Sequence, residues 1–248
     1  MPAILLLLAH IAGDFYLQTR RMAEKKAQSA GTLLLHSGIY GLCILLVALC
    51  FGTPGRAALA AGIAFAAHFV IDCAKLALNR KYPERQLLWF ALDQALHAAV
   101  LLALSAWLPG TSRIGAAVGA ALSGAVAAVL PGTAGHERRM ALAVLLYLAL
   151  WTPAGVVVRL TLDAFGKQES TAGEVARVGE LIGKLERAVA FTLCLLGAPA
   201  SIAFVLTAKS IARFKQLEEK GFAERYLIGT LLSVSLALLC YAAYQKAV

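Results

Sequence analysis

Eight stretches of 17 to 22 mostly apolar residues recur along this 248-residue chain, and they constrain its fold more than any other feature. A helix needs about 20 such residues to cross the hydrocarbon core of a membrane. We therefore predict an all-α, polytopic transmembrane helix bundle of about eight spans, the first of them retained rather than cleaved as a signal peptide. The stretches are 2–18, 32–51, 57–78, 87–108, 114–130, 140–158, 189–208 and 227–244.

The composition excludes several other classes of protein. Apolar residues make up 60% of the chain and charged residues only 15%, whereas about a quarter of a soluble domain is charged. A soluble globule of this size could not hide so much apolar surface. The five cysteines lie in apolar stretches without a CxxC pair, which argues against a disulfide framework. The net charge of +9 is not gathered in a basic, aromatic-rich domain, so we expect no nucleic acid partner.

Basic residues concentrate in alternate connectors, which predicts the topology. By the positive-inside rule these connectors are cytoplasmic and both termini lie outside. Connector 159–188 disagrees, since it carries both signs of charge. We expect it to be a polar, partly helical surface element, or else 189–208, broken at Gly197 and Pro199, re-enters the membrane. The basic connectors are 19–31, 79–86, 131–139 and 209–226, the last expected to form an amphipathic interfacial helix.

Ionisable side chains also lie inside the apolar stretches. Three of the four Asp and four of the five His fall there. One charge at the bilayer centre costs about 2.5–3.5 kcal/mol, so these groups need partners. Six of them form pairs four residues apart, which share one helix face. The pairs are His10–Asp14, His68–Asp72 and Asp93–His97, and His36 adds a fourth helix.

The depth of these residues and a weak repeat both suggest that they meet. At 1.5 Å per residue all seven lie roughly 6–15 Å below the cytoplasmic surface. Twice, a His–Asp pair in one span is followed by a His in the next, which suggests a parallel repeat of two hairpins. We expect a four-helix motif domain at 1–108, a two-helix membrane segment at 109–158 and a C-terminal part at 159–248. The two sets are His10, Asp14, His36 and His68, Asp72, His97.

Imidazole and carboxylate groups in this arrangement are typical of a metal site. They suit Zn, Mn or Fe, and seven groups exceed the four of one zinc, so the sequence predicts one or two divalent ions. We assign His36 and Asp93 as further ligands or as the catalytic acid–base pair. The alternative is that each pair is a hydrogen bond that holds helices together. The first-choice metal ligands are His10, Asp14, His68, Asp72 and His97.

Five further polar residues surround the expected site. Gln18 and Tyr40 continue the helix stripes by one turn, which fits contact with the ligands or ordinary interface polarity. Lys75, Arg20 and Arg21 lie at the cytoplasmic mouth, where they would attract an anionic head group. Snorkelling and topology also account for these three cations.

The motifs in the first part of the chain resemble a known family. They are the segment His10–Gln18 (HIAGDFYLQ), His36, the segment His68–Lys75 (HFVIDCAK) and the segment Asp93–His97 (DQALH). Over residues 1–108 they look like the bacterial integral-membrane family 3307 of the domains of unknown function. The resemblance implies a multi-pass protein of the bacterial cytoplasmic (inner) membrane, and it implies no particular reaction.

We expect a metal-dependent membrane hydrolase that acts on a lipid or lipid-linked phosphate or ester at the cytoplasmic leaflet. The expected partners are membrane lipid and an anionic or lipid-linked small molecule, and self-association is left open. A first alternative is a cation or proton-coupled transporter that uses the same His and Asp side chains. Further alternatives are a metal-dependent oxidase and a structural membrane protein.

Overall fold

The computed structural model describes residues 1–108, 110–129, 135–166 and 173–247, which form helices and turns with no strand among them. The chain divides into two compact units, Met1–Leu145 and Leu146–Val248. Unit 1 contains α1 (Pro2–Ile11), a π-helical turn (Ala12–Tyr16), α2 (Arg20–Lys26), α3 (Ala30–Ala48), α4 (Pro54–Lys81), a 3₁₀ turn (Pro83–Arg85), α5 (Gln86–Trp107), α6 (Arg113–Val129) and the first part of α7 (Glu137–Trp151).

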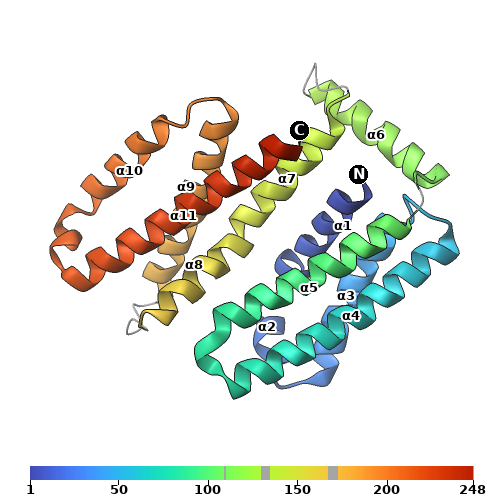
Figure 1. The fold of residues 1–248 in the computed structure, drawn as a ribbon, viewed down its shortest axis with the longest axis horizontal. Helices are drawn as coiled ribbons and strands as arrows, with labels where there is room; N and C mark the ends of the chain where they lie inside the picture. The colour runs from blue at the N-terminus through green and yellow to red at the C-terminus, as the bar shows by residue number, and fades with distance from the viewer. Residues whose placement is uncertain (109, 130–134, 167–172, 248) are drawn as a thin grey trace. The chain divides into compact units, whose positions relative to one another are not determined.

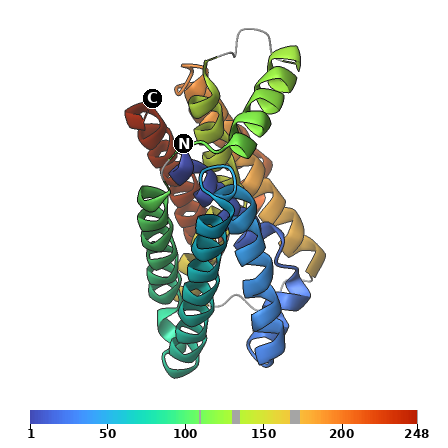
Figure 2. The same cartoon turned by 90° about the vertical axis from the view of Figure 1, so that its right-hand side faces the viewer.

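Four helices of unit 1 form a closed bundle. Helix α1 packs on α3 and α5, and α4 packs on the same two helices (Figure 1 and Figure 2). Helix α4 approaches its neighbours through a buried face of alanines, Ala57, Ala60, Ala61 and Ala64. Small residues of this kind allow the close helix contacts that are common in membrane proteins.

The interior of this bundle has an apolar half and a polar half. Leu6, Ile44 and Leu101 are fully buried in the apolar half, near the end where α3 turns into α4. The polar half lies toward the opposite end, where the basic connectors α1–α3 and α4–α5 meet. The Arg80 guanidinium donates to the backbone carbonyl of Ala27, which ties these two connectors together.

The start of α6 is fixed on the turn between α3 and α4. The Ser112 amide donates to the Cys50 carbonyl at 2.9 Å, and the Ser112 hydroxyl donates to the Leu49 carbonyl at 2.6 Å. A Cβ atom at Gly115 would lie 1.9 Å from the Cys50 oxygen. Only glycine therefore allows this approach.

Unit 2 contains the rest of α7, α8 (Pro153–Ala164), α9 (Gly173–Leu195), α10 (Ser201–Ala212), a 3₁₀ turn (Phe214–Glu218) and α11 (Lys220–Ala247). Helix α9 packs on α11, α8 contacts both, and α10 lies against α9 (Figure 1). Phe191 and Cys194 are central to its apolar core. The buried Arg187 donates to the Leu150 carbonyl at 2.8 Å and to the Ser233 hydroxyl at 3.3 Å.

The predicted class, an all-α bundle of transmembrane helices, is confirmed. Three of the predicted stretches, 2–18, 114–130 and 189–208, correspond to shorter apolar helices in the described residues. Five helical segments are long and apolar enough to cross a membrane, namely Ala30–Ala48, Pro54–Lys81, Pro83–Trp107, Glu137–Ala164 and Lys220–Ala247.

Two segments of the C-terminal part are interrupted. Stretch 189–208 is broken at the predicted Gly197 and Pro199, because α9 ends at Leu195 and the chain turns at Gly197, whose φ is +73°. Glycine adopts this backbone easily, and Pro199 cannot continue a helix. Segment 209–226 is divided between α10, the 3₁₀ turn and α11, a break that its sequence does not explain.

Candidate metal centre

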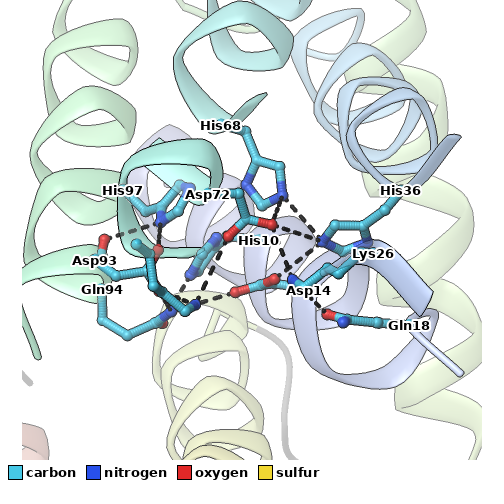
Figure 3. Close-up of polar contacts among 11 residues, drawn as sticks. His10, Asp14, Gln18, Lys26, His36, His68, Asp72, Asp93, Gln94 and His97 are labelled. Carbon is cyan, nitrogen blue, oxygen red and sulfur yellow. Dashed lines mark hydrogen bonds and ion pairs between the residues drawn. The ribbon is translucent and has the colours of Figure 1, made fainter. Parts of the chain in front are cut away.

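Polar side chains from all four bundle helices converge in the polar half of unit 1 (Figure 3). The register of the helices brings them there. On α4 the buried alanine face continues into His68 and Asp72, and on α5 the face that carries Leu101 begins with Asp93 and His97. The four imidazoles and three carboxylates of the predicted spans are each at most 6% exposed.

Asp14 enters the interior from the π-helical turn. The Leu17 amide donates to the Ala12 carbonyl, five residues back, at 2.8 Å. A Cβ atom at Gly13 would lie 3.2 Å from the Tyr40 ring, so glycine lets this turn lie close to α3. Short π-helical turns often occur at functional sites, because they redirect side chains.

Four side chains direct ligand atoms toward one another. The His36 Nε2 atom lies 3.2 Å from Asp14 Oδ1, 3.1 Å from His68 Nε2 and 3.7 Å from Asp72 Oδ2. His68 Nε2 lies 3.8 Å from Asp72 Oδ2. All four atoms lie within 4.8 Å of one another (Figure 3).

These distances match those between ligands that share one metal ion. Zinc binds nitrogen and oxygen at about 2.0–2.2 Å in a tetrahedral arrangement, which places neighbouring ligand atoms about 3.4 Å apart. The four distances from 3.1 to 3.8 Å bracket that value. Two imidazoles and two carboxylates could therefore hold a divalent cation with little movement.

The four ligand atoms offer more hydrogen-bond acceptors than they have hydrogens to share. A neutral imidazole carries one N–H, and an ionised carboxylate carries none. The single hydrogen that His36 Nε2 can carry cannot serve Asp14, His68 and Asp72 at once. A cation or an additional proton at the centre would relieve this repulsion.

Two lysines balance part of the negative charge. The Lys26 ammonium donates to Asp72 Oδ2 at 2.9 Å, and the Lys75 ammonium donates to Asp93 Oδ2 at 2.7 Å. Among the side chains that the structure describes, no ammonium lies within 4 Å of Asp14. Three carboxylates thus face two ammonium groups, and one negative charge remains at Asp14.

A second branch of contacts leads away from the four ligand atoms. Gln94 donates to Asp14 Oδ2 at 3.2 Å and to Asp93 Oδ2 at 2.9 Å, and its Oε1 lies 3.1 Å from His10 Nε2. His97 Nδ1 donates to the Asp93 carbonyl at 2.9 Å. The His97 and His68 rings are 4.6 Å apart.

The structure thus divides the predicted ligands into two groups. Asp14, His68 and Asp72 share the four-atom group with His36, which we had assigned to acid–base chemistry or to further ligation. His10 and His97 lie outside that group and stack on each other at 5.1 Å. The expected repeat is therefore not exact, because His36 joins the group and its counterpart His97 does not.

The surrounding candidates take different places. Tyr40 stacks on the His68 ring at 4.0 Å. With its amide assigned from its hydrogen-bond partners, Gln18 donates to the Asp14 carbonyl at 2.9 Å and accepts from Lys26 at 3.2 Å. Lys75 contacts Asp93, as described above. Arg21 is exposed on α2, and the Arg20 side chain lies outside the described residues.

Two residues of the site were missed as candidates. Gln94 lies in the segment Asp93–His97, inside an apolar stretch. An amide in such a stretch needs polar partners, and this was the signal that could have identified it. From the sequence, Lys26 is predicted only to be a basic residue of connector 19–31. No sequence signal distinguishes it from Lys25, because its role depends on how α2 folds back against α4.

Comparison with known proteins supports the family resemblance alone. Residues 3–117 match the model of a family described as a protein of unknown function (DUF3307), which confirms the resemblance of the N-terminal motifs. No curated protein and no solved structure matches the chain.

Proposed function

We propose that unit 1 binds one divalent metal ion and hydrolyses a lipid or lipid-linked phosphate or ester at the cytoplasmic leaflet. The observation that carries the proposal is the convergence of four buried ligand atoms within 4.8 Å of one another. Buried ionisable groups in membrane helices are expensive and usually functional. The ligands are Asp14, His36, His68 and Asp72.

Because a catalytic zinc keeps one position open, three of the four side chains would bind the metal, which would then supply a bound water of lowered pKa and polarise the substrate oxygen. The protein supplies the other groups. His97 donates its Nδ1 hydrogen to the Asp93 carbonyl, so in a neutral ring Nε2 carries the lone pair. Nε2 has no hydrogen-bond partner among the described residues, and we assign it as the general base that accepts a proton. The Lys26 ammonium lies beside the ligands, where it would stabilise negative charge that develops on the substrate.

Zinc is the metal that this donor set favours. Nitrogen and oxygen donors suit zinc, and three of these four side chains leave the open position that a catalytic zinc needs, whereas magnesium and calcium prefer more oxygen ligands. Manganese and iron(II) bind the same side chains in sites that keep more open positions. One group of this kind among the described residues argues for one ion rather than two.

Elemental analysis of the purified protein tests the metal site. We expect one equivalent of metal in the unmodified protein and less than about a tenth of that in His68→Ala. The matched control is His97→Gln, which removes a neighbouring buried imidazole outside the four-atom group and should keep the metal. A well-folded protein that neither contains nor takes up zinc, manganese or iron would refute the site.

Activity tests the reaction. Purified protein in mixed micelles is offered lipid phosphate monoesters, phosphodiesters and carboxylic esters, and released phosphate or fatty acid is measured. We expect His97→Gln to retain metal but lose at least about 100-fold in rate, the contribution of a general base. If hydrolysis is lost only in the variants that lack metal and His97→Gln stays fully active, His97 is not the general base.

Transport of a cation is the second candidate. It is favoured by continuous polar contacts that lead from His10 through Gln94 to Asp14, and from there through Gln18 to Lys26. In sealed liposomes that contain the protein, a transported metal would equilibrate with an internal indicator dye. We expect the metal to stay protein-bound. Equilibration that His68→Ala abolishes would replace the hydrolase with a transporter.

A further inference from the structure

A hollow of about 260 Å³ opens beside the candidate metal centre, between the α2–α3 connector and α4. Its lining is partly polar and partly apolar, and no carboxylate lines it among the described residues. The polar lining, called the basic side below, comprises Lys26, Arg80 and Ser29. The apolar lining, called the apolar side, comprises Leu33, Cys73, Leu76 and Ala77.

The basic side can bind an anion. Lys26 has three N–H groups and uses two of them, on Asp72 and Gln18. Arg80 has five and directs one nitrogen to the Ala27 carbonyl. The connectors that carry Lys26 and Arg80, 19–31 and 79–86, contain seven basic residues against two acidic ones. A net positive charge of this kind attracts anions.

The apolar side is close in sequence to exposed leucines of α3, a helix apolar enough to cross a membrane. Leu34 and Leu35, which follow the lining residue Leu33, are 53% and 60% exposed. Pockets for drug-sized ligands measure about 300–1,000 Å³, so this hollow accommodates a head group and the first part of a chain rather than a whole lipid. A ligand with a charged head and an apolar tail fits both sides.

We propose that this hollow binds the anionic head group and upper chain of a membrane lipid or lipid-linked phosphate. Its role as the substrate site rests on the proposed function, but binding itself does not. Lys26 joins the two sites, because the ammonium that lines the hollow also contacts Asp72 at 2.9 Å. A head group held by Lys26 and Arg80 would therefore lie next to the ligand atoms.

Cys73 offers a direct measurement, because it is exposed and lines the hollow. The full chain, with its other cysteines changed to Ala, is alkylated with a maleimide in detergent containing chelator. Short-chain phosphatidic acid, short-chain phosphatidylcholine and glycerol phosphate are compared as protecting ligands. We expect phosphatidic acid to slow alkylation of Cys73 at least about fivefold and the other two to have little effect.

Two variants separate the hollow from general surface charge. Arg80→Gln should weaken the protection about tenfold, whereas Arg85→Gln, an exposed cation on the same connector paired with Glu84, should not. Equal protection by phosphatidylcholine, or equal loss in both variants, would overturn the proposal. Equal protection by glycerol phosphate would make the ligand a soluble anion and overturn its lipid part. Since chelator is present throughout, failure of the metal site leaves this result unchanged.

Discussion

Replacing each ligand carboxylate of the metal centre by an amide should destabilise the metal-free protein much more at Asp72 than at Asp14. Both changes keep the shape of the side chain and remove one charge. Asp72 accepts from the Lys26 ammonium at 2.9 Å, and both side chains are nearly buried, at 1% and 9% exposed. Removing one partner of a buried ion pair costs about 3–5 kcal/mol. Asp14 accepts from His36 at Oδ1 and from Gln94 at Oδ2, so an amide can keep one of these two hydrogen bonds and loses the other.

Without metal, Asp72→Asn should therefore lose about 3 kcal/mol of unfolding free energy. Asp14→Asn should lose about 1 kcal/mol, the net value of the one hydrogen bond that an amide cannot replace. Zinc at 100 times its Kd should stabilise the unmodified protein by about 2.7 kcal/mol and neither variant.

Reversible denaturant unfolding in detergent, followed by tryptophan fluorescence with and without zinc, measures both quantities. Asp14→Gln serves as the control for side-chain size, since it removes the same charge but adds a methylene. If metal-free Asp14→Asn is as unstable as Asp72→Asn, the charge balance described here is incorrect. If Asp14→Asn still gains stability from zinc, Asp14 is not a ligand.

Three further predictions concern the stability of the fold. Lys75→Met should cost about 3–5 kcal/mol, because Asp93 Oδ2 lies 2.7 Å from the lost ammonium, and adding Asp93→Asn should recover part of the loss in the same unfolding assay. Gly115→Ala should lower unfolding free energy by about 1–3 kcal/mol through its clash with a backbone carbonyl, whereas Gly119→Ala, which meets nothing within 4 Å, should be neutral or stabilising. Gly197→Ala should cost about 1–2 kcal/mol, because the backbone there has φ +73°, and an unchanged melting temperature would show that this turn relaxes.

The polar half of the bundle was predictable because residue types in membrane helices are strongly constrained. A histidine or aspartate inside an apolar stretch must face protein, so the spacing of His68 and Asp72 already placed both on one interior face. The same argument applied to Asp93 and His97, and all four are buried.

Partner choice was not predictable from spacing alone. The four-residue separation of His10 and Asp14 assumes an α-helix, but the chain forms a π-helical turn from Ala12. The wider turn directs Asp14 toward His36 and leaves His10 facing Gln94. Such a turn depends on how closely it approaches α3, a tertiary contact that no local pattern reports.

The apolar half of the bundle limits how ions and water can reach the metal centre. Leu6, Ile44 and Leu101 are fully buried there and pack together in one apolar core. Ions and water would therefore have to enter and leave through the basic end, because the interior is closed at the apolar end. A chelator that cannot cross the bilayer should then strip the metal from one face of the membrane and be ineffective from the other.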